Sequence, residues 1–206
     1  MTEALPMFPL QTVLFPGVAM PLHVFEPRYR ALTRHCLDGD GCFGVVLIER
    51  GSEVGGGDAR LSVGTCARIV EAAELPDGRW VLMVLGVERV AVRRWLPDDP
   101  YPQAEVDFLD DAPAGPGAEE QRREVERLLR RALALKAELG EPAAAATVEL
   151  DADAALAAYQ AAALAPLGAL DSQRVLEQDG ADQRLALLAA LLTDEVSVLA
   201  QRASWG

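Results

Sequence analysis

Four residues with chemically useful side chains lie within five positions of one another, at Glu26, Arg28, Tyr29 and Arg30. A carboxylate, two guanidiniums and a phenol at this spacing could form a binding site. They also suit the start of a helix, where a carboxylate favours the first turn and an aromatic ring packs inward. The pattern favours this structural role. The functional alternative is a groove, lined by Phe25, Arg28 and Tyr29, that receives an extended polypeptide.

Conventional catalytic and metal-binding residues are few and poorly grouped. The histidines, His23 and His35, lack the nearby nucleophile and third orienting group that a catalytic triad requires. The cysteines, Cys36, Cys42 and Cys66, form no Cys-x-x-Cys pair, so reduced and buried thiols are expected rather than disulfides. A zinc site at His35, Cys36 and Cys42 would lack a second close pair of ligands. We therefore expect no catalytic residue, no metal and no cofactor.

The composition argues against several kinds of partner. Half of the 206 residues are apolar, and the net charge is −13. Residues 1–110 carry 10 basic and 16 acidic side chains, and residues 111–206 carry 9 and 16. Neither half has a basic excess, so nucleic acid and anionic membrane surfaces are not expected as partners. With no apolar run of roughly 18 to 20 residues and no recognisable signal peptide, we expect a cytoplasmic protein.

The candidate residues are positioned by a proline-rich stretch at the N-terminus. Five prolines lie between positions 6 and 27, and each removes a backbone donor. The two short strands predicted here should therefore be edge-like, bulged or bent. Pro16 and Gly17 form a turn between them. Pro27 then suits the first turn of a helix that ends at Gly39.

The rest of the first half is predicted to be a curved, barrel-like sheet. Its strands are rich in β-branched residues and alternate between apolar and polar positions. A hairpin turn is predicted at 76–78, and Gly86 suits a bulge or bend. Residues 50–60 form a loop whose triple glycine, 55–57, lacks the Lys-Ser/Thr of a phosphate-binding loop. The predicted strands are 42–49, 63–75, 80–85, 87–95 and 103–108.

In the second half of the chain, the interval at which apolar residues recur changes from two residues, typical of a strand, to 3.6, typical of a helix. Residues 111–117 contain prolines and glycines and are predicted to be a linker between a β-rich domain, 1–110, and a helical domain, 118–206. Helices are predicted at 119–139, from Asp151 to Pro166, around 171–177, and from Gly180 to about Leu199. The fold class is therefore α+β, with a β-barrel-like half followed by a helical bundle.

Three motifs near the N-terminus carry a family resemblance. Phe-Pro-Leu at 8–10, Leu-Phe-Pro-Gly at 14–17 and Pro-Leu-His-Val-Phe-Glu-Pro-Arg-Tyr-Arg at 21–30 resemble the opening of the Lon protease N-terminal, or substrate-binding, domain family. The likeness continues through 43–47, 63–70, 75–78, 85–89 and 101–106, and a weaker likeness extends into the helical half. The resemblance implies a PUA-like barrel followed by a helical bundle.

The modules that follow this domain in full-length Lon have no counterpart here. A Walker A loop needs Gly-Lys-Ser/Thr, and a Ser–Lys dyad needs a desolvated lysine. Lys136 is the only lysine, and it lies on the polar side of a predicted amphipathic helix. Neither ATPase nor peptidase activity is expected, and the chain resembles a free-standing bacterial member of the family.

The resemblance implies a non-catalytic module that binds unfolded or extended polypeptide segments. It could serve as an adaptor, a holdase-like binder or a modulator of a separate protease or chaperone. Two alternatives stay open at the level of the sequence. One is an RNA-binding PUA-like protein, which the acidic balance disfavours. The other is a small-ligand-binding protein or an unrecognised hydrolase, which would require a deep polar pocket.

Overall fold

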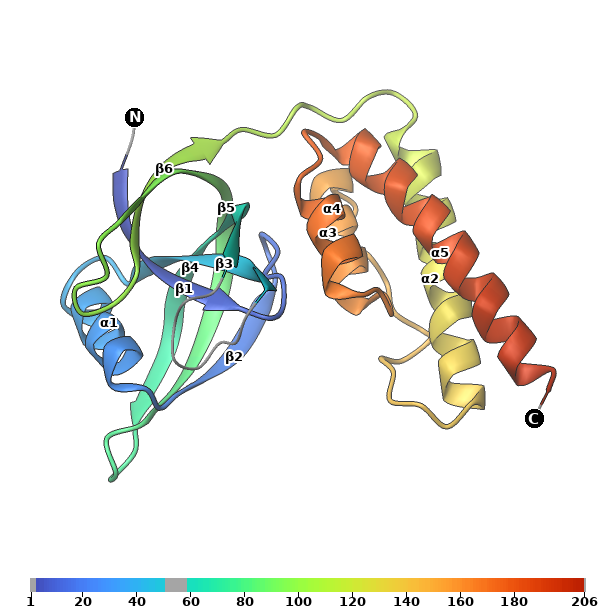
Figure 1. Ribbon diagram of the computed structural model, residues 1–206. Helices are drawn as coiled ribbons and strands as arrows, with labels where there is room; N and C mark the ends of the chain where they lie inside the picture. The colour runs from blue at the N-terminus through green and yellow to red at the C-terminus, as the bar shows by residue number, and fades with distance from the viewer. Residues whose placement is uncertain (1–2, 51–58, 206) are drawn as a thin grey trace. The chain divides into compact units, whose positions relative to one another are not determined.

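The computed structural model describes residues 3–50 and 59–205. The chain divides into two compact units, Met1–Asp110 and Asp111–Gly206. The described part of the first unit contains six strands and one helix, and that of the second contains four helices (Figure 1). The predicted α+β class is confirmed. Most of the loop predicted at 50–60, with its triple glycine, lies outside the described residues.

A closed ring of strands forms the first unit. The sheet order is β2-β5-β4-β3-β1-β6, and a further pairing of β5 with β6 closes the ring. Closure removes most of the free sheet edges and leaves a small barrel around an apolar core. The elements are β1 (Glu3–Leu10), β2 (Ala19–Val24), α1 (Pro27–Asp38), β3 (Cys42–Arg50), β4 (Ala59–Glu74), β5 (Trp80–Leu96) and β6 (Gln103–Leu109).

The proline-rich strands occupy two different places in the sheet. β2 pairs only with β5 among the described residues, as expected for an edge strand. β1 lies inside the ring, so of the expected forms it does not take the edge-like one, and it changes its partner midway. Residues 3–6 of β1 pair with β6, whereas residues 7–10 pair with β3. Because each half of β1 pairs with a single strand among the described residues, a proline without an N–H can be accommodated on the other side.

β5 is one long strand that joins the predicted ranges 80–85 and 87–95, and the bulge expected at Gly86 is present as a shift of register against β4 between Gly86 and Glu88. Its first half pairs with β2 and its second half with β6, while β4 runs along both. Gly86 lies at the change of partner, and a Cβ at this position would come 2.2 Å from the Phe15 carbonyl oxygen. The glycine therefore marks a close backbone approach within a continuous strand.

The barrel core is covered at one end by α1. The helix buries Tyr29, Leu32, Thr33 and Cys36. This stripe packs into a cluster that draws on β1 to β5 and includes Phe8, Phe43 and Leu82 among its largest side chains. The helix has Pro27 in its first turn, as the sequence indicates.

The second unit is an α-helical bundle, made of α2 (Ala118–Glu138), α3 (Ala154–Leu164), α4 (Ala169–Leu176) and α5 (Ala181–Ala203). α3 begins three residues after the predicted cap, and Asp153 caps it by accepting a bond from the Leu156 N–H at 2.9 Å. α2 and α5 supply most of the large apolar side chains of the core. No helix of the described residues is both long and apolar enough to cross a bilayer.

The segment 111–117 is attached to the bundle. Asp111 forms two hydrogen bonds with Arg184 of α5, at 2.7 and 2.5 Å. The Ala112 N–H donates to the Asp179 carbonyl at 3.0 Å, and the Gly115 N–H donates to the Asp182 carboxylate. These contacts give the segment defined partners in the second unit.

Candidate functional site

A cavity of about 290 Å³ lies on the barrel between the end of β1, the edge strand β2 and the first turn of α1. Strand alternation on β2 buries Leu22 and Val24 and leaves His23 exposed. The strand ends at Val24, so Phe25 lies in the short connection to α1. The cavity is lined by Phe8, Leu10, Pro21, Leu22, His23, Val24, Phe25, Glu26 and Tyr29.

Phe25 is the exposed aromatic residue of this cavity. Its side chain is 53% exposed, whereas the other aromatic residues of the lining, Phe8 and Tyr29, are 6% and 3% exposed. Exposing a phenyl ring forfeits the free energy that its burial would contribute, about 1.5 to 3 kcal/mol. An exposed phenylalanine beside an apolar cavity is typical of a surface that binds another apolar group.

Tyr29 forms the rigid floor of the cavity. Its ring stacks on Phe8, with centroids 4.0 Å apart and an angle of 10° between the planes. The Arg28 guanidinium carbon lies 4.5 Å from the Tyr29 centroid. Because Phe8 occupies one face of the ring, Arg28 must cover the other. Arg28 also pairs with Glu26 at 3.0 Å.

The residues of the predicted groove therefore have different positions. Phe25 and Tyr29 line one cavity, whereas Arg28 lies against the Tyr29 ring and outside the lining. Glu26 occupies the N-cap position of α1 but makes no side-chain capping bond, because its carboxylate turns to Arg28. The lining residues from β1, Phe8 and Leu10, were not predicted. Nothing local in the sequence indicates that they meet β2.

A second, smaller cavity lies on the barrel and shares Phe25 with the first. Its volume is about 80 Å³, and its wall includes the hairpin turn between β4 and β5. The lining residues are His23, Val24, Phe25, Leu75, Arg79 and Trp80. Phe25 thus stands between two cavities, with β2 contributing to both.

The bundle contains a larger and more open cavity, of about 610 Å³, along α2 and α5. Its floor is apolar, from Leu185, Ala186 and Ala189, and its wall on α2 is charged. Two of the wall arginines are neutralised within α2, since Arg123 pairs with Glu119 and Arg127 with Glu124. Size alone therefore does not make this cavity the better candidate, because it has no exposed aromatic residue in its lining.

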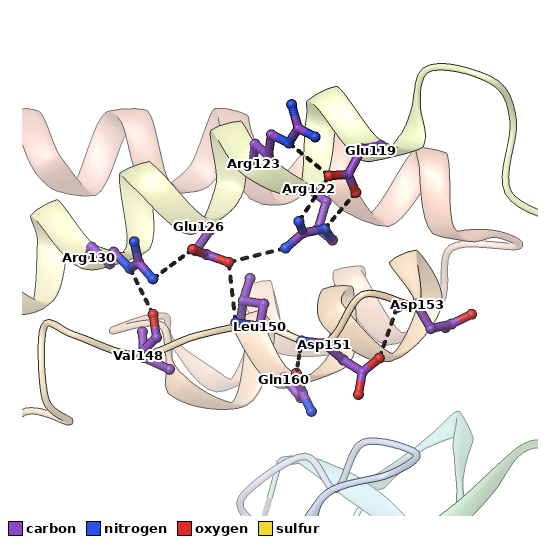
Figure 2. Close-up of polar contacts among 10 residues, drawn as sticks. All are labelled: Glu119, Arg122, Arg123, Glu126, Arg130, Val148, Leu150, Asp151, Asp153 and Gln160. Atoms are coloured by element: carbon purple, nitrogen blue, oxygen red, sulfur yellow. Dashed lines mark hydrogen bonds and ion pairs between the residues drawn. The ribbon is translucent and has the colours of Figure 1, made fainter.

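The charged residues of α2 bind one another and the chain that follows the helix. Figure 2 shows Arg122 between Glu119 and Glu126, and Arg130 donating to the Val148 carbonyl at 2.7 Å. The Glu126 carboxylate accepts from the Leu150 N–H at 3.3 Å. The bonds from Arg122, and then those from Arg123, lower the pKa of Glu119 to about 2. This network is explained by its structural role.

The three thiols are buried, and the surroundings of Cys36 and Cys66 make these two poor nucleophiles. Burial, assisted by Asp40, raises the pKa of Cys36 to about 12. Burial and the neighbouring Cys42 raise the pKa of Cys66 to about 12 as well. Because the thiolate is the reactive form, neither thiol suits catalysis at neutral pH. Among the residues that the structure describes, no three His, Cys, Asp or Glu side chains are grouped to hold a metal.

Comparison with known proteins extends this description. Residues 4–194 match the family described as the ATP-dependent protease La (LON) substrate-binding domain. Lon protease 2 of Herpetosiphon aurantiacus is 31% identical over 202 residues, which are 96% of this chain and 24% of that protein. Lon protease of Escherichia coli strain K12 is 27% identical over 205 residues, 95% of this chain and 25% of that protein. The chain thus spans about a quarter of the length of these relatives.

Solved structures agree with the sequence comparisons. The crystal structure of a Lon N-terminal domain protein from Xanthomonas campestris has a TM-score of 0.68 and 30% identity, and the match covers 91% of this chain and 98% of that one. The N-terminal domain of Mycobacterium avium complex Lon protease also has a TM-score of 0.68, at 19% identity, with 95% and 98% covered. The second of these similarities concerns the fold alone.

Proposed function

The chain belongs to the family of Lon substrate-binding domains, and from this premise we propose that it binds extended or unfolded polypeptide segments without catalysing a reaction on them. The binding site is the surface around Phe25 with its two flanking cavities. The observation that carries this proposal is the 53% exposed Phe25 ring beside a rigid aromatic floor. An apolar side chain of the bound polypeptide would enter the larger cavity and cover the ring.

The edge strand β2 favours recognition through side chains over the addition of a long strand. An edge strand offers unpaired backbone groups that an extended peptide can use. Pro21 lies in the middle of β2 and has no N–H, so it interrupts any row of donors along that edge. Affinity would come mainly from the apolar anchor, with backbone bonds restricted to a few positions.

In the cell, such a module could deliver segments to a protease or influence one. The relatives that match the chain are Lon proteases. We propose that this chain acts in protein quality control as the recognition part, with catalysis supplied by other modules. The cytoplasm is the compartment in which this role is expected.

The test uses a labelled, permanently unfolded protein, titrated with this protein without nucleotide and followed by fluorescence anisotropy. We expect saturable binding that is weakened about tenfold or more by Phe25→Ala. Phe25 is the residue to change because it is exposed, whereas Tyr29 is part of the core and its truncation would damage the fold.

Phe108→Ala is the matched control. Phe108 is 38% exposed on β6 and lines neither cavity beside Phe25. Its truncation should leave binding within about twofold of the unchanged protein. Equal losses in the two variants would contradict the site, and no binding at tens of micromolar protein would contradict the function.

A further inference from the structure

Arg30 is a half-buried cation without a counter-ion in the described structure. Within residues 3–50 and 59–205, its guanidinium forms no ion pair, and its Nε atom is buried without a hydrogen-bond partner. A partly desolvated guanidinium has lost hydration that only a strong acceptor can replace. In a chain with a net charge of −13, such a cation is a notable exception.

The neighbouring charges do not compensate for Arg30, because they are already paired. Glu26 pairs with Arg28 at 3.0 Å. Asp77 pairs with Arg79 at 2.7 Å, and Glu74 pairs with Arg34 at 2.8 Å. These three pairs are locally neutral, so Arg30 adds one positive charge to this part of the surface.

Arg30 lies at the turn that forms the wall of the smaller cavity. A Cβ at Gly78 would come 2.1 Å from the Arg30 Nη2 atom, so the guanidinium packs directly against this glycine. The same turn supplies Leu75, Arg79 and Trp80 to the cavity. The indole Nε1 of Trp80 is a second buried donor for which the described residues provide no acceptor.

We propose that the site selects a polypeptide carrying a carboxylate close to its apolar anchor, and that Arg30 is the residue that determines this preference. The inference rests on the proposed function and adds a charge requirement to it. The anchor would occupy the larger cavity beside Phe25, and the carboxylate would bind Arg30 at the hairpin turn. The planar guanidinium suits a carboxylate because it can donate two parallel bonds. An aspartate or glutamate side chain or a chain terminus could supply this carboxylate.

The test compares short fluorescent peptides that contain one phenylalanine and differ at a single nearby position. One set carries aspartate one, two or three residues from the phenylalanine, and a matched set carries asparagine. Both sets have blocked termini. A third set has only asparagine and a free C-terminal carboxylate close to the phenylalanine. We expect the best aspartate peptide, or the free terminus, to bind about fivefold or more tightly than its uncharged counterpart.

Variants then assign the preference to Arg30. Arg30→Gln should remove it while leaving the affinity for the asparagine peptides within about twofold, and Arg30→Lys should retain part of it. Arg94→Gln is the control, because Arg94 is exposed, pairs with Glu105 and lines neither cavity beside Phe25. Should Arg30→Gln fail to fold, the preference in the unchanged protein and its decline with added salt still test the inference.

The outcomes separate this inference from the proposed function. If aspartate and asparagine peptides bind equally and Phe25→Ala weakens both, the carboxylate preference is overturned and the polypeptide-binding function stands. If the preference survives in Arg30→Gln, the assignment to Arg30 is overturned. If none of the peptides and no unfolded protein bind, both proposals fail together.

Discussion

Individual side chains in the N-terminal motif have separate roles that their spacing does not reveal. Tyr29 is a core residue, stacked on Phe8 and covered by Arg28. Phe25 is exposed at the same site and is the residue available to a ligand. The two neighbouring arginines also differ, in their ion pairing. Arg28 is paired with Glu26, whereas Arg30 lacks an ion pair among the described residues.

The buried thiols allow a prediction at this scale. Cys36 and Cys66 should react with iodoacetamide at pH 8 far more slowly in the folded protein than in the denatured one, because burial raises their pKa to about 12 and thiolate is scarce. Mass spectrometry of peptides from both samples measures the difference. Equal labelling of the folded and denatured protein would contradict it.

The raised pKa values of Cys36 and Cys66 also predict that the folded protein loses stability at high pH. The folded thiols stay neutral above the unfolded value of 9.0, whereas the unfolded thiols ionise. Their contribution is therefore complete below pH 9 and is lost as the pH rises toward 12. A Cys36→Ala variant should lose less stability over this interval than the unchanged protein.

The continuous strand β5 depends on a glycine, because the backbone of another segment comes very close to it there. Gly86 lies where β5 changes partner, and a Cβ there would be 2.2 Å from a backbone oxygen. β5 can pass this point as one strand only because no side chain is present. At this point the Gly86 backbone bonds the turn before β2, since its carbonyl accepts from the Gly17 N–H at 2.8 Å and its N–H donates to the Val18 carbonyl at 3.0 Å.

Gly86→Ala should therefore destabilise the barrel by about 2 kcal/mol or more, because a backbone oxygen cannot move aside as a flexible side chain can. Gly117→Ala is the control, since its Cβ would meet nothing within 4 Å and its φ of −92° suits any residue. That variant should stay within about 0.5 kcal/mol of the unchanged protein. Urea denaturation of both variants measures the difference, and similar values would refute the steric argument.

The two units of the molecule have different sources of stability. The barrel has backbone pairing around a closed ring, whereas the bundle depends on apolar helix faces and on a buried arginine, Arg184, that pairs with the more exposed Asp111. Arg184 is fully buried, and it binds Asp111 and the Gln178 carbonyl and lies over the Tyr159 ring. Asp111 in turn accepts from the Tyr159 hydroxyl at 3.0 Å.

Arg184→Met should destabilise the bundle by about 2 to 3 kcal/mol, because it removes the charge-assisted hydrogen bonds from the buried guanidinium to Asp111 and to the Gln178 carbonyl. The matched control is Arg174→Met, which breaks the exposed pair with Asp171 and should cost less than about 1 kcal/mol. Chemical denaturation followed by helical circular dichroism distinguishes the two. Losses of the same size would show that Arg184 contributes no more than a surface pair.

Much of the fold could be predicted because its signals are local. Proline and glycine positions marked the turn at Pro16 and the start of α1, and the change of period marked the passage from strands to helices. Gly86 interrupts the sequence pattern without ending β5, and the predicted bulge lies there as a shift of register against β4. The sequence could not decide which of the expected forms, edge-like, bulged or bent, β1 takes, because the partners of a strand are set by distant segments.

The sequence by itself determined the α+β class, the order of strands and helices, and the motifs of the Lon substrate-binding family. All of these depend on residue types at fixed short spacings. Only the tertiary structure decided that Phe8 and Leu10 meet β2 around a cavity, that Phe25 stands exposed between two cavities, and that Arg30 lacks a counter-ion among the described residues. The physical reason is that cavities, burial and ion pairing arise from strand register and long-range packing, which no local pattern specifies.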